Sequence, residues 1–393
     1  MGVTAAIIGL AVLILVHEAG HFFVARWVGM RPRKFYLGFG PPLVKHVRNG
    51  VEYGIAALPI GGYVKIPGMH RPSAGDVRAS LPHDTQPQYA ARLDQIDAAI
   101  DRGDEVSARE LVAELRPELG DNRYLQELEW SLAPDAYWRQ TLWKKVFVIG
   151  AGPGTNALIA IVLFIAVFML GQVQVTRTVQ RVLPGHPAAA AGLRADDRIL
   201  IVNGHRVVPD TISKAINSTH GKPFTIVARR AGRPVTIGPL RARRVQDVYR
   251  VGFELKGVIG PGYSFPHATW AALRVAGQVT SGTVHSVAGL FVGSGTHDIS
   301  SAVGIVRVTS QAFRQSLQDF LGVVGLVSLA LALLNLLPVL PLDGGHIVIS
   351  IVERIRGRAF SQLAYARYSA VGLTFFIFLL YLGLRNDFSS GHS

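Results

Sequence analysis

Two histidines and a glutamate lie inside one of the most apolar stretches of the chain, in the segment VHEAGHFFV at residues 16–24. His17, Glu18 and His21 fit the pattern H-E-x-x-H. Residues four apart share one face of a helix, so both imidazoles can reach a single ion. Zinc accepts such nitrogen ligands, and Glu18 can take a proton from water held at an open position of the metal. The pattern therefore predicts a zinc site that hydrolyses its substrate.

The apolar setting argues against a chance match, which would usually fall on an exposed polar helix. Residues 3–16 carry no charge and nothing more polar than Thr4. His17 lies about 14 residues, or roughly 21 Å, into this apolar segment. Ionisable groups at such a depth in a bilayer are costly and tend to mark function.

A third metal ligand is expected in the stretch NLLPVLPLDGGH at residues 335–346. Asp343 ends an apolar run, and Pro338 and Pro341 are expected to distort the helix before it. Its carboxylate would complete the two-histidine, one-carboxylate set of soluble zinc proteases. Taken alone, Asp343 could instead cap a helix at the membrane surface. His346 could face the same site or be a plain interfacial histidine.

Composition limits the other chemistries. The 393 residues include no cysteine, which excludes disulfides, thiolate metal sites and cysteine nucleophiles. Apolar residues make up 49% and the mean hydropathy is +0.30, which points to membrane spans. The net charge of +14 would suit nucleic acid or anionic lipid. No nucleic-acid motif occurs, so we expect the basic residues beside membrane lipid.

Four segments are long and apolar enough to cross a bilayer, at residues 3–29, 146–170, 320–352 and 368–384. The N-terminus has no basic stretch and no cleavage pattern, so the first is predicted to be a retained span. Lys and Arg follow the first span, precede the second and follow the third. They share one side if the chain crosses four times, which predicts a cytoplasmic segment 30–145 and extracytoplasmic termini.

One charge count opposes this topology. Residues 176–256 would be outside, although they carry 15 Lys and Arg against 5 Asp and Glu. Long domains translocate largely regardless of charge, so the prediction is kept.

Two segments between the first two spans differ in character. Residues 36–66 alternate short β-prone runs with Gly and Pro, as strands and turns do. Residues 71–142 are charged and rich in Ala and Leu, and they predict a cytoplasmic helical insertion with a break at Arg102-Gly103. A solvated spacer and a partner-binding role suit this insertion equally.

Residues 174–256 are predicted to form a β-rich soluble domain. A short helix at residues 188–192 is expected to lead to a strand at 198–202, and Asn203-Gly204 predicts a hairpin turn. Residues 257–317 are predicted to be an amphipathic connecting region.

Several motifs together resemble the site-2 protease family. They are H-E-x-x-H in the first span, N-x-x-P-x-x-P-L-D-G in a later span, and HPAAAAGLRADDRILIVNGHRV (186–207), which is similar to PDZ domains. GFGPPL (38–43), YGIAALPIGGYVKI (53–66) and AGPGTNALIA (151–160) match as well. More narrowly, the chain resembles bacterial RseP-type regulated intramembrane zinc metalloproteases, and its single PDZ-like domain resembles actinobacterial members. Only residues 71–142 are longer than this resemblance leads us to expect.

The resemblance implies a fold and a function. The fold would be a polytopic α-helical membrane protein of the bacterial inner membrane, with four transmembrane helices, a membrane-associated β-hairpin at residues 36–66 and one extracytoplasmic PDZ-like domain. The enzyme would be a zinc-dependent intramembrane endopeptidase. Its partners would be single-span membrane proteins such as anti-sigma factors or remnant signal peptides, already trimmed by another protease.

The resemblance also implies roles for particular residues. The Zn²⁺ ligands would be His17, His21 and Asp343, and the general base would be Glu18. The hairpin would receive the substrate as an added strand. The substrate-binding residues would be Asn335, Gly61, Gly62 and Tyr63.

Other classes of protein remain as alternatives. A catalytically inactive PDZ membrane scaffold would not need the H-E-x-x-H and L-D-G motifs together. Other membrane metalloproteases usually add a downstream Glu ligand on a helix, whereas the best partner here lies in L-D-G. A metal transporter would need several intramembrane acids, and only Glu18 and Asp343 qualify.

Overall fold

The computed structural model describes residues 1–171, 173–245, 248–291, 302–360 and 362–389. The chain forms two compact units. The first combines Met1–Val167 with Ala268–Ser393, and the second is Phe168–His267.

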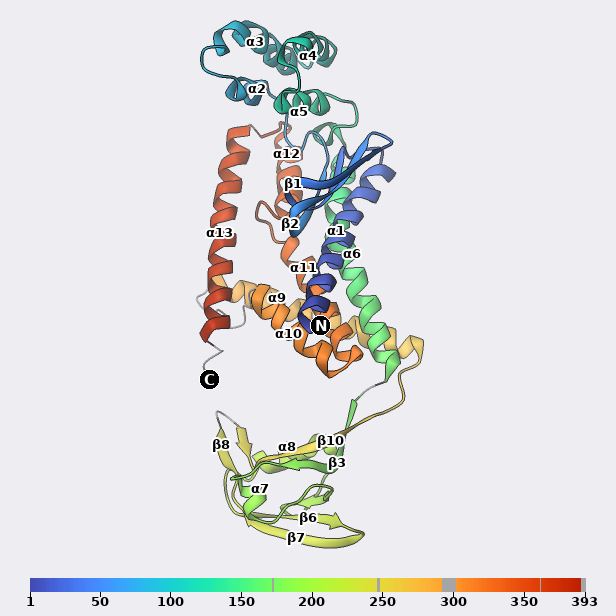
Figure 1. The fold of residues 1–393 in the computed structure, drawn as a ribbon. Helices are drawn as coiled ribbons and strands as arrows, with labels where there is room; N and C mark the ends of the chain where they lie inside the picture. The colour runs from blue at the N-terminus through green and yellow to red at the C-terminus, as the bar shows by residue number, and fades with distance from the viewer. Residues whose placement is uncertain (172, 246–247, 292–301, 361, 390–393) are drawn as a thin grey trace. The chain divides into compact units, whose positions relative to one another are not determined.

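Four helices among the described residues are long and apolar enough to cross a bilayer (Figure 1). They are α1 (Gly2–Trp27), α6 (Leu142–Leu170), α11 (Leu317–Asn335) and, within α13 (Gln362–Ser389), the stretch Ala364–Gly383. Their backbone hydrogen bonds close within each helix, as a lipid environment requires. The fold is that of a multi-pass membrane protein, as the sequence predicts.

Two tryptophans mark one membrane boundary. Trp27 ends α1 and is 79% exposed, while Trp143 near the start of α6 is 72% exposed. Both line one shallow surface pocket, so these helix ends lie at the same level. Exposed tryptophans gather where lipid headgroups meet hydrocarbon. Arg26 and Lys144 beside them fit the same boundary.

The segment predicted as a single span at residues 320–352 is two helices, so that prediction was wrong. Helix α11 ends at Asn335, and α12 (Asp343–Arg356) begins at Asp343 itself. Pro338 and Pro341 in the intervening turn cannot continue a helix. The turn also folds back on Gly344, where an added Cβ would lie 2.2 Å from the Leu336 carbonyl oxygen. A glycine is therefore required beside Asp343.

The predicted connecting region at residues 257–317 contains two helices. These are α9 (Phe265–Phe291) and α10 (Ala302–Gln315). Helix α10 packs against α1 and α11 of the first unit.

The β-prone segment after α1 forms two long antiparallel strands, β1 (Lys34–Arg48) and β2 (Val51–Lys65). The stretch 34–37 pairs with residues 52–55 on one side and 62–65 on the other. Gly38 and Gly61, with φ of +90° each, allow the strands to fold in this way. The row at 62–65 pairs with 34–37 on its inner side, and no strand in the described part of the chain pairs with its outer side.

The insertion predicted at residues 71–142 is helical. It contains α2 (Gly75–Ser80), α3 (Gln86–Arg102), α4 (Glu105–Leu119), α5 (Arg123–Ser131) and a 3₁₀ turn, η1 (Tyr137–Arg139). Helix α3 ends at the predicted break, where Gly103 takes a φ of +75°. Asp104 then caps α4 by accepting a 3.1 Å hydrogen bond from the Ser107 amide.

The insertion is fixed to the base of the β-hairpin. Lys65 forms an ion pair with Glu127 at 3.0 Å, and Arg33 forms one with Asp135 at 3.1 Å. The backbone amide of Tyr137 also donates to the Pro67 carbonyl at 2.9 Å. With its own buried core, the insertion is a folded part of the first unit rather than a solvated spacer.

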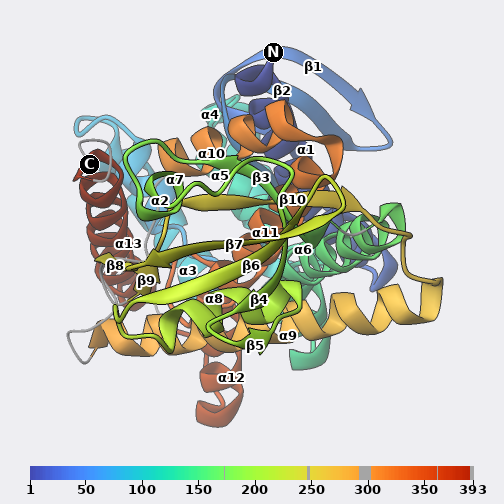
Figure 2. The ribbon, with the colours of Figure 1, turned by 90° about the horizontal axis from the view of Figure 1, so that it is seen from below.

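The second unit is built on a sheet with the order β10-β3-β4-β6-β7, in which β5 also pairs with β4. Its strands are β3 (Val173–Val182), β4 (Arg198–Val202), β5 (His205–Arg206), β6 (Phe224–Arg230), β7 (Arg233–Leu240) and β10 (Phe253–Ile259). The remaining elements are α7 (Pro187–Ala190), α8 (Pro209–Asn217) and a small hairpin of β8 (Arg243–Val245) and β9 (Val248–Arg250). Figure 2 shows β6 and β7 side by side as one long hairpin.

The predicted strand at residues 198–202 coincides with β4. The turn after it contains Asn203 and Gly204 with φ of +48° and +79°, the left-handed geometry expected of an Asn-Gly hairpin turn.

A buried carboxylate stabilises the second unit. Asp197 is fully buried and accepts hydrogen bonds from Arg230 Nε at 2.7 Å and from the Arg194 amide at 2.8 Å. Burial alone raises the pKa of Asp197, but the bonds from Arg230 and Arg194 outweigh it and the pKa is lowered. The stabilisation is therefore fully present above the pKa of an ordinary aspartate, about 4. It is lost as the pH falls through the lower pKa that Asp197 has in the folded protein.

We expect Asp197→Asn to destabilise this unit by about 1.5–3 kcal/mol, because hydrogen bonds to a buried carboxylate are weakened or lost, among them those from the partly exposed Arg230 guanidinium. Faster hydrogen exchange in β4 and β6 of the full-length protein at pH 7 would show it. Asp196→Asn is the matched control, because Asp196 is exposed and its φ of +66° suits asparagine. The effect should shrink below about pH 4. Equal exchange at pH 7 would contradict the prediction.

Candidate active site

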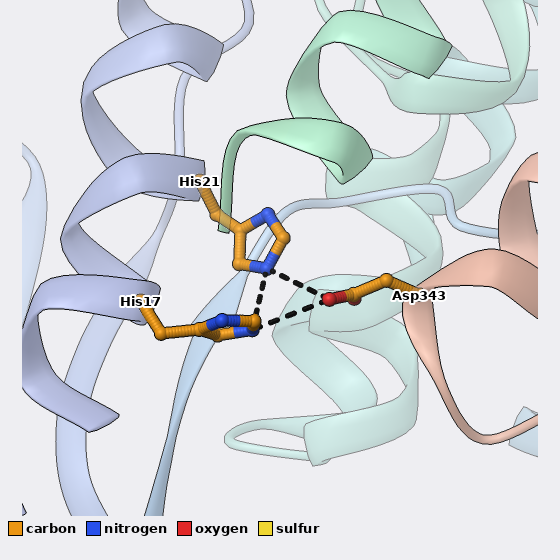
Figure 3. A group of neighbouring side chains, drawn as sticks. All are labelled: His17, His21 and Asp343. Atoms are coloured by element: carbon orange, nitrogen blue, oxygen red, sulfur yellow. Dashed lines mark hydrogen bonds and ion pairs between the residues drawn. The ribbon is translucent and has the colours of Figure 1, made fainter. Parts of the chain in front are cut away.

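Three predicted residues meet in the first unit (Figure 3). His17 and His21 project from adjacent turns of α1, and Asp343 comes from the first turn of α12. Asp343 Oδ2 lies 3.2 Å from His17 Nε2 and 3.5 Å from His21 Nε2, and the two Nε2 atoms are 3.2 Å apart. More than 300 residues of sequence separate the two parts of this cluster.

The donor set of this cluster fits a zinc ion. Two imidazole nitrogens and one carboxylate oxygen converge, with all donor atoms within 4.8 Å of one another. Asp343 Oδ2 is buried and receives no well-formed hydrogen bond from the part of the chain that the structure describes, although it faces two histidines that are each only 7–8% exposed. A buried acceptor in this state needs a positive partner. Two nitrogens and a carboxylate are a common catalytic zinc set.

Helix α6 contacts the outer side of both imidazoles. His21 Nδ1 lies 2.8 Å from the Val148 carbonyl oxygen, and His17 Nδ1 lies 3.3 Å from the side-chain amide of Asn156. The carbonyl oxygen can only accept, so His21 Nδ1 carries the hydrogen and Nε2 keeps its lone pair for a metal. Val148, Gly152 and Asn156 are spaced by four and share one face of α6.

Glycines allow α1 and α6 to approach closely. An added Cβ on Gly152 would lie 2.3 Å from His21 Nε2 and 2.8 Å from His17 Cε1. An added Cβ on Gly20 would lie 2.6 Å from the Ala151 carbonyl oxygen. The imidazoles therefore occupy the space above Gly152, where any side chain would displace them.

Glu18 lies between the histidine pair and the β-hairpin. It is half-buried, and the backbone amide of Val64 is within hydrogen-bonding reach of its carboxylate. A Cβ on Gly62 would lie 3.0 Å from Glu18 Cγ. The unpaired edge at residues 62–65 therefore runs directly past this carboxylate.

The other predicted residues make contacts outside the three-residue cluster. Tyr63 stacks on Tyr36 with ring centres 5.3 Å apart, and Gly61 lies against the Phe39 ring. Asn335 ends α11 and donates its amide to the Leu331 carbonyl oxygen at 3.0 Å.

His346 has a structural contact. Its Nδ1 meets the Tyr365 hydroxyl, which joins α12 to α13. This contact accounts for a histidine three residues after Asp343 in the sequence.

The α6 contacts were not predicted from the sequence. The stretch AGPGTNALIA at residues 151–160 resembles the family, but the resemblance implies no role for its residues. An asparagine inside an apolar span was the available signal, since a buried amide needs a partner. No sequence signal identifies the Val148 carbonyl, because every residue has one.

Comparisons with known proteins agree with this geometry. A family model described as peptidase family M50 matches residues 5–380. A Rhizobium meliloti protein named as a candidate zinc metalloprotease is 29% identical over 395 residues, which cover 96% of this chain and 94% of the relative. An Agrobacterium fabrum protein named in the same way is 26% identical over 401 residues, covering 98% and 94%. The Enterococcus faecalis protein Eep, named as a candidate protease, is 26% identical over 419 residues, covering 97% of each.

The family match spans nearly the whole chain and includes both the H-E-x-x-H helix and the L-D-G turn. The names of the relatives support Zn²⁺ as the cofactor. From the four apolar helices, the converging donors and this match, we conclude that the chain belongs to peptidase family M50, the site-2 protease family, and is a membrane zinc metalloendopeptidase.

Proposed function

We propose that this enzyme cleaves peptide bonds inside the transmembrane segments of single-span proteins, with His17, His21 and Asp343 as zinc ligands and Glu18 as the general base. The convergence of these donors inside the membrane helices carries the proposal. His17 lies ten residues before Trp27, which places it about 15 Å along the helix from the membrane boundary. A bilayer core is about 30 Å thick, so the site lies near its middle.

The catalytic roles follow from the positions of the side chains. Zinc, when bound, supplies a Lewis acid that activates water and polarises the scissile carbonyl. Glu18 accepts a proton from the attacking water and later donates it to the leaving amine nitrogen. Gly62 and the Val64 amide of the hairpin lie beside the Glu18 side chain, where the hairpin passes α1.

The β-hairpin gives the substrate a place to bind in extended form. The outer side of the row at residues 62–65 has no partner strand among the described residues, and the row passes Glu18. An extended peptide can add to such an edge as a further strand. A transmembrane helix must unwind to do so, because its carbonyls are otherwise hydrogen-bonded within the helix. Gly61, Gly62 and Tyr63 would then contact the added strand, and Asn335 would bind substrate backbone near the cleft.

The substrates that fit this site are single-span proteins, such as anti-sigma factors or remnant signal peptides, in regulated intramembrane proteolysis. The second unit is the PDZ-like domain in this proposal, and it would admit substrates that another protease has trimmed. It and both termini would face the outside of the bacterial inner membrane. An inactive PDZ scaffold would leave the three buried donor groups without a ligand.

The proposal is tested with purified full-length protein, reconstituted with a single-span reporter protein. We expect the native enzyme to hold about one zinc per chain and to cut within the apolar segment of the reporter. His21→Ala and Asp343→Ala should lose both the zinc and the cleavage, because two ligands hold the ion poorly. Metal analysis and mass spectrometry of the fragments measure these outcomes. Full zinc content in both variants, or cuts only outside the apolar segment, would refute the proposal.

A further inference from the structure

Asn156 is a buried amide in the middle of a membrane helix. It is 1% exposed, and its backbone carbonyl accepts a 2.7 Å hydrogen bond from the Ser328 hydroxyl of α11. Its side-chain Nδ2 lies 3.3 Å from His17 Nδ1. Its Oδ1 is buried and has no hydrogen-bond partner among the described residues. A buried amide oxygen without a donor is costly, so this group calls for an explanation.

The chemistry of a metal-binding histidine explains why a buried amide oxygen lies here. For Nε2 of His17 to coordinate zinc it must carry a lone pair, so the hydrogen of the neutral ring sits on Nδ1. That N–H is buried and needs an acceptor. For His21 the acceptor is the Val148 carbonyl. For His17 the neighbouring group is the Asn156 amide, whose oxygen and nitrogen ends are nearly equal in size.

A half-turn about the Cβ–Cγ bond of Asn156 exchanges those two ends. Oδ1 then faces Nδ1 of His17 and accepts its hydrogen. In the unrotated arrangement, Nδ2 of Asn156 donates a hydrogen bond to Nδ1 of His17. This arrangement suits the His17 tautomer that carries its hydrogen on Nε2, the nitrogen that lies 3.2 Å from Asp343 Oδ2. An amide carries both a donor and an acceptor, so one side chain can serve both tautomers of the ring.

We propose that Asn156 is a positioning residue that selects the metal-binding tautomer of His17. It accepts the Nδ1 hydrogen when zinc is bound and donates to Nδ1 when zinc is absent. This inference rests on the proposed role of His17 as a ligand. The Nδ1 partner of His21 is a backbone carbonyl, which a substitution cannot remove. The Nδ1 partner of His17 is the Asn156 side chain, so a substitution there can alter the hydrogen bond.

Two substitutions separate hydrogen bonding from packing. Asn156→Leu keeps the branched shape and the number of non-hydrogen atoms but removes the acceptor, and we expect it to weaken zinc binding by about 10–100-fold, the usual effect of losing such a partner. Asn156→Asp keeps an acceptor for Nδ1–H, and we expect its zinc affinity to stay within about threefold of native. Ser328→Ala is the matched control, because it removes the other hydrogen bond of Asn156 without touching the imidazole. Its zinc affinity should equal the native value.

Zinc affinity is measured on the full-length protein in detergent, by competition with a chelating dye, alongside circular dichroism to verify folding. We expect the highest zinc affinity in the native protein, Asn156→Asp and Ser328→Ala, which should be similar. The affinity of Asn156→Leu should be lower, and that of His17→Ala should be the lowest. Native affinity in folded Asn156→Leu would overturn the inference while leaving the site intact. If Asn156→Leu does not fold, a folded Asn156→Asp that binds as weakly as His17→Ala overturns it equally. Full zinc binding by His17→Ala would instead overturn the proposed site itself.

Discussion

Replacing Glu18 with glutamine is expected to lower the rate of peptide cleavage by about 10²–10⁴-fold while the zinc content stays at the native level. Glutamine has nearly the same shape but cannot take a proton from water. Glu18 is not among the three converging donors, so the ion should remain bound. Cleavage of a single-span reporter and metal analysis of the same preparation give the two readings.

His21→Ala serves as the comparison for this variant, because it should lose activity by losing the metal. The two variants therefore separate a missing proton carrier from a missing ion. A Glu18→Gln enzyme that cleaves within about tenfold of the native rate would remove Glu18 as the general base. A Glu18→Gln enzyme without zinc would show instead that Glu18 is needed to build the site.

Replacing Gly152 with alanine is expected to weaken zinc binding and cleavage together. The new Cβ would lie 2.3 Å from His21 Nε2 and 2.8 Å from His17 Cε1, closer than atoms approach without movement. Overpacking of this kind typically costs about 1–3 kcal/mol. If the strain falls on the ligating rings, zinc affinity should drop by about 10–100-fold, since about 1.4 kcal/mol is tenfold.

The same helix offers matched controls for Gly152→Ala. Gly150 and Gly154 lie two residues to either side, and a Cβ on either meets no atom of the described residues within 4 Å beyond its own turns of α6. Gly150→Ala and Gly154→Ala should bind zinc and cleave the reporter as the native enzyme does. Chelator competition measures the affinity in all three variants. Equal affinity in all three would show that the rings can yield to the methyl group and that the face of α6 does not constrain them.

The contacts of α6 give this helix a defined part in the site. One face, at residues 148, 152 and 156, supplies a carbonyl for one imidazole, space for both rings and an amide for the other. A metal site whose ligands are held from the outer side in this way loses little entropy when the ion binds. The proposed zinc site would therefore depend on α6 as well as on α1 and α12, the two elements that would supply its ligands.

The sequence by itself determined the local parts of this protein. The spacing of His17 and His21 puts both rings on one helical face, which follows from the helical repeat alone. Four apolar segments predict four membrane helices, because length and hydropathy suffice for that conclusion. The strand at residues 198–202 and the Asn203-Gly204 turn follow from alternation and turn chemistry in the same way. In each case the cause lies within a few neighbouring residues.

Only the tertiary structure decided how these parts meet. It brought Asp343 within 3.5 Å of both histidines, a contact that the sequence could predict from residue types and a resemblance but could not show. It also divided the predicted span at 320–352, because the packing of Leu336 against Gly344 is not visible as hydropathy. The alignment of Asn156 with His17 depends on how two helices cross. Hydrophobic periodicity records which face of a helix is apolar, but not which distant residue will lie against it.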